Sequence, residues 1–338
     1  MEEMRLGRTD LRVGRTGFGA IPIQRVTFDE AKALLRRAYE AGVTFFDTAR
    51  GYSDSEEKIG YALADVRKDV VIATKINAAD RKAFLAELET SLRNLKTDHV
   101  DLLQLHWPKE LPDPDDPQSS YAGLVEARET GKTRFIGITH HALDVARRAV
   151  RSGLYDTLQF PLNHISSEED LALVEACREH DVGVIAMKAL SGGLITDAST
   201  SFAFLRQYDN VVPIWGVQRP EELEQILALE ENPPVLDDAM RAAIKKDRAE
   251  LAGDFCRACG YCLPCPQDIP IPMAARMGLL LRRMPYQRLL TEEWQEKMAR
   301  VETCTECGQC LERCPYGLEV PQLLRKMLDN YRAFLAGS

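Results

Sequence analysis

The chain has 338 residues, of which 45% are hydrophobic and 28% are charged, and this composition is typical of a globular protein. Length alone predicts about two domains. A formal net charge of −9 argues against nucleic acid as a partner, because phosphate binding requires a basic surface. We find no run of about 18 apolar residues and no apolar core of a signal peptide. We therefore expect no membrane span and a cytoplasmic location.

Eight short apolar runs alternate with amphipathic helical patterns over roughly the first 230 residues. Apolar runs without polar alternation are typical of strands with both faces buried. The predicted strands are Thr16–Ile23, Thr44–Ala49, Val70–Lys75, Asp101–His106, Arg134–Thr139, Thr157–Asn163, Gly183–Leu190 and Val211–Val217. The intervening patterns predict helices, for example over Asp29–Ala41, Lys82–Leu95 and Ser167–His180.

This alternation predicts an α/β fold, a (β/α)8 TIM barrel. A doubly wound sheet is the alternative. Gly17-Phe18-Gly19 is only a fragment of the Gly-x-Gly-x-x-Gly pattern that would favour that sheet, and it is weak by itself.

The nine cysteines are distributed unevenly, with only Cys177 before residue 256 and the other eight between residues 256 and 314. This change in composition predicts a domain boundary. We expect a barrel over residues 1–232 and a connector helix over 233–254, after Pro233-Pro234. A small, mainly helical domain over 255–338 then follows and ends in an amphipathic helix, about Pro321–Leu335.

The late cysteines form two runs, each of which ends in Cys-Pro. The first is Cys256-x2-Cys259-x2-Cys262-x2-Cys265-Pro266, and the second is Cys304-x2-Cys307-x2-Cys310-x3-Cys314-Pro315. Such runs are typical of ligands to 4Fe-4S clusters. Zinc is the rival metal, although structural zinc sites usually use two separated cysteine pairs. Disulfides are not expected in a reducing compartment, and we expect Cys177 to be a buried packing residue.

The two runs resemble those of two-cluster ferredoxins, and the resemblance implies two 4Fe-4S clusters with one cysteine exchanged between the runs. It assigns one cluster to Cys256, Cys259, Cys262 and Cys314. It assigns the other to Cys304, Cys307, Cys310 and Cys265. The first run departs from the ferredoxin pattern, because two residues rather than three precede its last cysteine.

Polar residues end three consecutive predicted strands, namely Asp47, Lys75 and His106, and Tyr52 lies in the loop after Asp47. In a TIM barrel the carboxyl ends of the strands meet at one rim, where catalytic residues lie. A buried carboxylate needs a partner, and Lys75 is the expected partner of Asp47. The alternative is a structural Asp–Lys pair with a packing tyrosine and histidine.

Together these motifs resemble the aldo-keto reductase family. The resemblance rests on Leu6-Gly7-Arg8-Thr9-Asp10-Leu11-Arg12-Val13, Phe18-Gly19, Phe46-Asp47-Thr48-Ala49 with Tyr52, Ala73-Thr74-Lys75 and Leu103-Gln104-Leu105-His106. It implies a catalytic tetrad of Asp47, Tyr52, Lys75 and His106, with Tyr52 as proton donor and a nicotinamide as hydride donor. We expect the Lys75 ammonium to lower the pKa of Tyr52, and His106 to orient a carbonyl or alcohol substrate.

The resemblance also implies nicotinamide-binding residues. Thr139 and His140 replace a Ser-Asn pair of the family, and Met187 replaces an aromatic ring. The other expected residues are Gln159, Asn163, Gly216, Gln218 and Arg219. Filling of a loop by His140 and core packing of Met187 are the alternatives. Arg219 is the only cation where the family presents basic residues to the 2′-phosphate of NADP, and Glu221 and Glu222 follow it. The choice between NADP and NAD therefore stays open at this point.

A nicotinamide transfers two electrons as hydride, whereas a 4Fe-4S cluster transfers one, and we find no flavin signature that would connect them. Three hypotheses follow. The chain is a carbonyl reductase or alcohol dehydrogenase whose helical domain shapes the substrate pocket. Alternatively, a redox protein partner delivers single electrons through the clusters to a different reduction. In the third hypothesis the chain is a redox sensor or electron-transfer subunit without catalysis.

Overall fold

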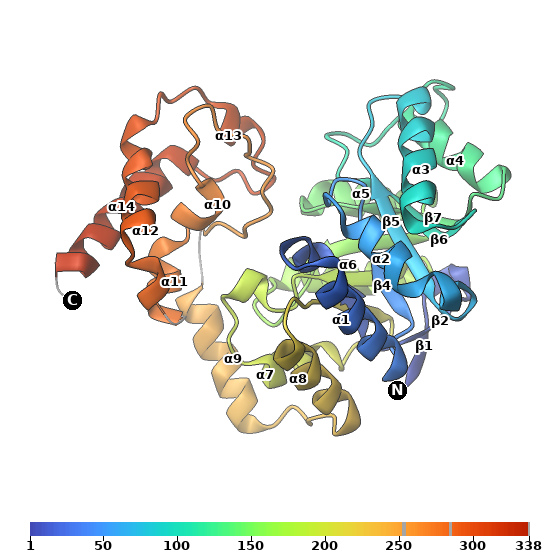
Figure 1. Cartoon of the computed structure of the whole chain (residues 1–338), viewed down its shortest axis with the longest axis horizontal. Helices are drawn as coiled ribbons and strands as arrows, with labels where there is room; N and C mark the ends of the chain where they lie inside the picture. The colour runs from blue at the N-terminus through green and yellow to red at the C-terminus, as the bar shows by residue number, and fades with distance from the viewer. Residues whose placement is uncertain (252–254, 284–285, 337–338) are drawn as a thin grey trace. The chain divides into compact units, whose positions relative to one another are not determined.

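The computed structural model describes residues 1–251, 255–283 and 286–336. The chain forms two compact units (Figure 1). The barrel unit contains Met1–Ala189 and Ser199–Asp237, and the helical unit contains Leu190–Ala198 and Asp238–Ser338. The nine-residue segment Leu190–Ala198 therefore belongs to the helical unit although it interrupts the barrel sequence. Within the described ranges, we find no helix with the length and apolar character that a membrane crossing requires.

The barrel unit contains a closed barrel of eight parallel strands, as the sequence predicts. Each strand pairs with its neighbours in chain order, and the last pairs with the first. The strands are β3 (Gly17–Gly19), β4 (Phe45–Asp47), β5 (Val71–Ile76), β6 (Val100–His106), β7 (Thr133–Thr139), β8 (Thr157–Pro161), β9 (Gly183–Met187) and β10 (Val211–Gly216). Every residue of β5 is buried, which explains why its sequence shows no polar alternation.

A helix follows each strand of the barrel (Figure 1). The helices are α1 (Phe28–Glu40), α2 (Ser55–Leu63), α3 (Arg81–Leu95), α4 (Ser120–Glu129), α5 (Leu143–Ser152), α6 (Glu168–Glu179), α7 (Ala198–Leu205) and α8 (Pro220–Glu231). Polar caps begin several of them. In α1, for example, Thr27 and Glu30 form a capping box that satisfies backbone N–H groups of the first turn.

The first predicted strand is wrong at its carboxyl end. Strand β3 ends at Gly19, and Ile21–Arg25 forms a short 3-10 helix whose second residue is Pro22. Proline lacks the N–H group that pairing in the sheet requires, so the strand cannot continue through Pro22. A hairpin of β1 (Glu3–Arg5) and β2 (Arg12–Gly14), which the sequence did not reveal, precedes the barrel.

Apolar residues of this hairpin pack into the barrel core. Leu6 and Val13 are fully buried in one cluster with Phe45, Leu102 and Val212. Gly7 allows this packing, because its φ is +52° and a Cβ atom there would lie 2.1 Å from the backbone nitrogen of Gly183. The hairpin therefore packs against the barrel through close backbone approach as well as through apolar contact.

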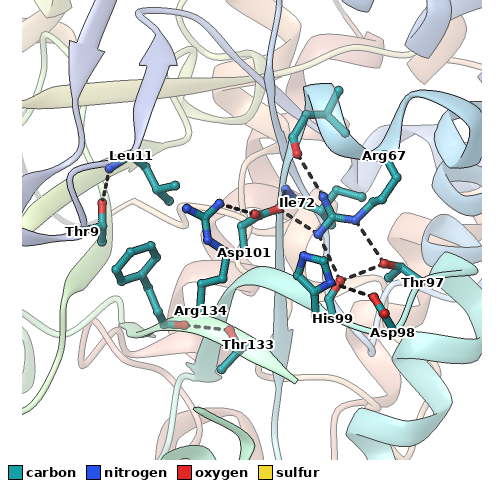
Figure 2. Close-up of polar contacts among 12 residues, drawn as sticks. Thr9, Leu11, Arg67, Ile72, Thr97, Asp98, His99, Asp101, Thr133 and Arg134 are labelled. Carbon is teal, nitrogen blue, oxygen red and sulfur yellow. Dashed lines mark hydrogen bonds and ion pairs between the residues drawn. The ribbon is translucent and has the colours of Figure 1, made fainter. Parts of the chain in front are cut away.

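A buried carboxylate joins three strands near their amino ends (Figure 2). Asp101, the second residue of β6, accepts a hydrogen bond of 2.9 Å from the backbone N–H of Ile72 on β5. It also forms ion pairs of 2.9 Å with Arg67 and 2.8 Å with Arg134, a residue of β7. The guanidinium of Arg67 donates further hydrogen bonds to the carbonyl oxygens of Val70 and His99. Asp101 is thus buried with both of its oxygens paired.

The helical unit contains six α-helices within its described residues, and α14 packs against α10 and α11 (Figure 1). They are α9 (Asp238–Glu250), α10 (Ile271–Ala274), α11 (Met277–Arg283), α12 (Glu292–Ala299), α13 (Gln309–Glu312) and α14 (Val320–Ala336). Tyr331 of α14 is buried, and its hydroxyl donates to the carbonyl oxygen of Leu289 at 2.7 Å. The expected connector helix over residues 233–254 contains α9, which is grouped with this unit, and residues 252–254 lie outside the described residues.

Candidate active site

Polar side chains gather at the carboxyl ends of three adjacent strands of the barrel. Asp47 is the last residue of β4, Lys75 is the next to last of β5, and His106 is the last of β6. Tyr52 lies in the loop between β4 and α2. This is the rim where parallel barrels place catalytic residues.

Asp47 and Lys75 form a buried ion pair with a distance of 2.7 Å between Nζ and Oδ2. Their side chains are only 3% and 1% exposed, so solvent screens this pair little. Lys75 Nζ also donates to the carbonyl oxygen of Thr48 at 2.5 Å. The lysine therefore holds the carboxylate and the first residue of the following loop together.

Tyr52 lies between the lysine and the histidine. Lys75 Nζ is 5.1 Å from the centre of the Tyr52 ring. The Tyr52 and His106 rings meet edge to face, with centres 5.8 Å apart and planes at 83°. Backbone hydrogen bonds position the loop, from Thr48 N–H to Ala73 O at 2.9 Å and from Tyr52 N–H to Ala49 O at 3.0 Å.

Burial sets the ionisation of these groups. It raises the pKa of Asp47 and lowers the pKa of Lys75, and in each case the charge of the partner opposes the change. Burial also lowers the pKa of His106 to about 3, and the Lys75 charge contributes, so this imidazole is neutral at pH 7. The pKa of Tyr52 is raised, first by burial and then by the charge of Asp47.

This direction for Tyr52 is opposite to the expectation from the Lys75 ammonium alone. The expectation omitted the desolvation of the phenolate and the negative charge of Asp47, which accompanies Lys75. In this state Tyr52 is a neutral phenol that holds its proton.

Two glutamines extend the cluster across the barrel interior. Gln159 of β8 donates from Nε2 to Asp47 Oδ2 at 3.4 Å, although β4 and β8 are not paired. Gln104 of β6, which sequence reasoning missed, donates from Nε2 to Gln159 Oε1 at 3.0 Å. Its signal was an amide between Leu103 and Leu105, two residues before His106 and therefore on the same face of the strand. Within the described residues, Asp47 Oδ1 and Gln104 Oε1 have no hydrogen-bond partner.

Glu56 is a second residue that sequence reasoning missed. This carboxylate of α2 is fully buried and accepts from Thr74 Oγ1 at 2.7 Å and from Arg50 Nη1 at 2.7 Å. It thereby joins the loop that carries Tyr52 to β5, beside Lys75. Its charge acts to raise the pKa of Lys75, against the larger effect of burial. The sequence signal was the helical spacing of Glu56 with Ile59, which places it on the inner face of α2.

Apart from Gln159, the middle residue of β8, the expected nicotinamide residues of β7, β8 and β9 lie at or just beyond the carboxyl ends of these strands. Thr139 ends β7 and is opposite Gln159 in the register. His140 is held by backbone groups, since its Nδ1 accepts from Ala142 N–H at 2.9 Å and its Nε2 lies 3.1 Å from Pro108 O. Asn163 donates to Lys188 O at 2.9 Å, and Met187 packs partly buried against the core.

Glu222 occupies the amino end of α8, close to Gln218 and Arg219. Its Oε2 accepts from the backbone N–H groups of Gln218 at 3.0 Å and Arg219 at 3.2 Å. Its Oε1 binds the Arg219 guanidinium at 2.6 Å. Helix amino termini favour anions, and here an anion of the chain itself takes that place. Gly216 ends β10 at the same rim and is exposed.

The eight late cysteines line two hollows in the helical unit. Cys256, Cys259, Cys262 and Cys314 line one hollow. A second hollow is lined by Cys265, Cys304, Cys307 and Cys310, and also by Cys262. Each hollow therefore combines cysteines from both sequence runs.

The chemistry of these donor sets suits a bound cationic centre. Burial, together with the neighbouring charges of Cys256 and Cys259, raises the pKa of the Cys262 thiol to about 12. The backbone N–H of Ala258 donates to the Cys256 sulfur at 3.4 Å. Several sulfurs around one hollow repel one another as thiolates, and bound iron compensates such charge while it keeps its ligands deprotonated. Within the described residues, no three His, Cys, Asp or Glu side chains are arranged to hold a single metal ion.

A closed parallel barrel with an Asp–Lys–Tyr–His rim, in one chain with a helical unit that has two cysteine-lined hollows, defines a class of barrel oxidoreductase with an iron–sulfur domain. The model of the aldo/keto reductase family matches residues 11–203, and the chain belongs to this family. A second model, the 4Fe-4S dicluster domain, matches residues 255–319.

Two curated relatives match the barrel part of the chain. Aldo-keto reductase YhdN of Bacillus subtilis is 28% identical over 220 residues, which are 59% of this chain and 65% of that protein. L-galactose dehydrogenase of Arabidopsis thaliana is 33% identical over 212 residues, which are 57% of this chain and 66% of that protein. The matches thus span just under two thirds of these relatives.

Solved structures share the barrel fold. The thermostable aldo-keto reductase Tm1743, in complex with the inhibitor epalrestat, is 26% identical with a TM-score of 0.62, and the match covers 73% of this chain and all of that chain. An aldo-keto reductase from Klebsiella pneumoniae in complex with NADPH has a TM-score of 0.63 at 23% identity, and the match covers 72% of this chain and 94% of that chain. We take the latter likeness as evidence for the fold alone.

Proposed function

We propose that this protein reduces the carbonyl group of a small molecule, or oxidises the corresponding alcohol, with a nicotinamide cofactor as the hydride carrier. The observation that supports this most directly is the position of Lys75 Nζ. It is 2.7 Å from the Asp47 carboxylate and 5.1 Å from the Tyr52 ring, which meets the neutral His106 imidazole. A buried cation between a carboxylate and a phenol at the rim of a barrel favours proton transfer.

A nicotinamide fits the acceptors at this rim. Two oxygens, Asp47 Oδ1 and Gln104 Oε1, lack donors among the described residues. They suit a ligand that brings N–H groups, as a carboxamide does, because buried acceptors without donors are costly. When bound, the nicotinamide supplies the hydride. Gln159 then orients the Asp47 carboxylate through its Nε2 contact.

Tyr52 supplies the proton that balances the reaction. Reduction of a carbonyl adds one hydride to carbon and one proton to oxygen, and the developing alkoxide is far more basic than a phenolate. A neutral Tyr52 with a raised pKa can therefore still donate to it. The Lys75 ammonium then stabilises the phenolate, while neutral His106 donates a hydrogen bond to the substrate oxygen.

We propose NAD rather than NADP as the preferred cofactor. In the family, the loop after the last strand binds the 2′-phosphate of NADP. In this chain Glu222 already occupies the Gln218 and Arg219 amides and the Arg219 guanidinium. A phosphate there would meet a carboxylate and would have to displace it, whereas NAD has no such group.

We also propose that the helical unit holds two 4Fe-4S clusters. The ligand sets are those of the two hollows, so Cys314 joins the first cysteine run and Cys265 joins the second. The iron and sulfide contents of protein purified without oxygen test this proposal. Contents that correspond to two clusters per chain support it, and the absence of iron contradicts it.

The experiment on Tyr52 tests the reductase function. In Tyr52→Phe, reduction of a panel of carbonyl compounds with NADH should fall by about 10³-fold in kcat, because general acid catalysis contributes about 10² to 10⁴-fold. The melting temperature and iron content should not change, and Tyr61→Phe, in an exposed tyrosine of α2, is the matched control. Full activity of Tyr52→Phe contradicts the proposal. Activity only with dithionite-reduced clusters, and none with NADH, supports the electron-fed alternative.

A further inference from the structure

The segment Leu190–Ala198 belongs to the helical unit, yet peptide bonds join both of its ends to the barrel unit. It begins three residues after the end of β9, whose last residue is Met187. It therefore follows the carboxyl end of a barrel strand along the chain, and in such barrels the loops after these strand ends form the active site.

Two arginines of the helical unit hold this segment by its backbone. Arg276 Nη1 donates to Gly192 O at 2.9 Å, and Arg283 Nε donates to Leu194 O at 2.7 Å. Gly192 is suited to this contact, because its φ is +63° and a Cβ atom there would lie 3.1 Å from Arg276 Nη1.

The two arginines differ in their surroundings. Arg283 is paired with two carboxylates of α9, those of Asp247 and Glu250. Arg276 is 5% exposed, and its other hydrogen bonds within the described residues are to neutral groups, from Nε to Pro272 O at 2.9 Å and from Nη2 to Met273 Sδ at 3.7 Å. A buried guanidinium is costly without a negative partner.

The first cysteine hollow lies close to Arg276, since the preceding residue, Ala275, is one of its lining residues. A Cβ atom on Gly192 would lie 3.1 Å from Arg276 Nη1 and 3.9 Å from the Cβ of Ala258, one of the two residues between Cys256 and Cys259. Arg276 therefore contacts the segment and lies close to the loop that carries two ligands of the proposed first cluster.

We propose that Arg276 is a positioning residue that joins the segment Leu190–Ala198 to the first iron–sulfur site and raises the reduction potential of the cluster held there. The inference rests on the proposed function in one respect, namely that Cys256, Cys259, Cys262 and Cys314 hold a cluster. Reduction adds one negative charge to a cluster, and a buried cation nearby favours the reduced form. The same guanidinium donates a hydrogen bond to the backbone of the segment at Gly192, and so links the segment to the cluster.

Three variants separate the charge of Arg276 from the tether, by which we mean the hydrogen bond from an arginine to the backbone of the segment. Arg276→Met removes both, Arg276→Lys keeps the charge without the planar fork, and Arg283→Met removes a tether whose charge is already paired within α9. For each variant, iron content is measured first. The potentials of both clusters are then measured by redox titration followed by electron paramagnetic resonance, and hydrogen exchange is measured in residues 190–198.

In Arg276→Met we expect retained iron and a potential of one cluster lowered by about 59 mV, a tenfold change in its reduction equilibrium. The other cluster is the internal control and should not shift. In Arg276→Lys the potential of that cluster should change by less than a third of the shift expected in Arg276→Met. All three variants should exchange faster in residues 190–198.

Unchanged potentials in Arg276→Met overturn the proposal, as does an equal shift in Arg283→Met, which would assign the effect to the segment rather than to the charge. Absence of iron from the unaltered protein contradicts the cluster proposal itself. Absence of carbonyl reduction contradicts only the proposed function, because the cluster potentials can still be measured. If Arg276→Met fails to fold, Arg276→Lys still tests the tether, and unchanged exchange in that variant overturns it.

Discussion

The barrel contains two buried aspartates near opposite ends of its strands, and they differ in how far their charge is compensated. Asp101, near the amino end of β6, binds two arginines and a backbone N–H, and both of its oxygens are paired. Asp47, at the carboxyl end of β4, has one cation, Lys75, and its Oδ1 has no partner among the described residues.

This difference separates a structural carboxylate from a functional one. Folding favours a buried charge whose hydrogen bonds are complete, as at Asp101. A carboxylate with an incomplete set keeps acceptor capacity for a ligand and shifts its own ionisation and that of its neighbours, as at Asp47. Variants of Asp101 and Asp47 test whether the two ends of the barrel respond in opposite ways, and variants of His106 and Glu222 test the carboxyl end alone.

The largest effect is expected on stability at Asp101. Asp101→Asn should lower the free energy of unfolding by about 3 kcal/mol, because it removes one charge from a buried ion-pair network and leaves the guanidinium of Arg67 uncompensated. Urea unfolding measures this, and activity per folded molecule should not change. Asp98→Asn, at a side chain that is 94% exposed, is the control and should change stability by less than about 0.5 kcal/mol. Equal effects of the two variants would contradict the structural role.

Asp47→Asn should have the reverse profile. We expect kcat/KM to fall by about 100-fold, because burial lowers the pKa of Lys75 and the lysine loses its charge once the carboxylate is absent. The free energy of unfolding should fall by less than about 1.5 kcal/mol, since the buried lysine can release its proton. Steady-state kinetics and urea unfolding measure the two effects. A stability loss as large as that of Asp101→Asn, with activity retained, would remove the distinction between the two ends.

His106 should make stability depend on pH. Its pKa is about 3 in the folded chain and about 6.5 when unfolded, so between these values the unfolded state binds more protons. Stability from this residue is complete above pH 6.5 and is lost as the pH falls toward 3, by at most about 1.4 kcal/mol per pH unit. His106→Gln should remove this slope between pH 5 and 6.5, whereas His99→Gln should leave it in place. An unchanged slope in His106→Gln would show that the imidazole is not desolvated.

The smallest effect is expected at Glu222, where an anion of the chain is bound at the same rim. Glu222→Gln should improve the affinity for NADPH by about fivefold and leave the affinity for NADH nearly unchanged, because a carboxylate near the Arg219 guanidinium is removed. Fluorescence titration measures both affinities, and Glu221→Gln is the matched control. Parallel changes for both cofactors would contradict a specific effect on the 2′-phosphate.

Local sequence patterns predicted most of the fold. Seven of the eight predicted strands agree with the structure to within three residues at each end, because both faces of each strand are buried and the pattern is strong. The first failed at Pro22, where an apolar run contains a residue that cannot donate to a sheet. The hairpin β1–β2 was missed because its burial depends on close contact between Gly7 and Gly183, which are distant in sequence.

For the candidate site, the sequence identified the residue types and their positions at the ends of strands. It did not identify the contacts across the barrel, such as that between Gln159 and Asp47, since these depend on closure of the sheet. The direction of the Tyr52 pKa also required the structure, because desolvation depends on the surrounding atoms and not on the nearest charge in the sequence.

By itself, the sequence determined a strand–helix repeat that closes into a barrel, an Asp–Lys–Tyr–His set at one rim, and eight cysteines in two runs. These features are local, since each depends on the spacing of residues along one strand, helix or loop. Only the tertiary structure decided that Leu190–Ala198 belongs to the helical unit, and that both oxygens of Asp101 are paired whereas, among the described residues, Asp47 Oδ1 is not. Those features depend on which distant segments meet and on how much water their contact excludes.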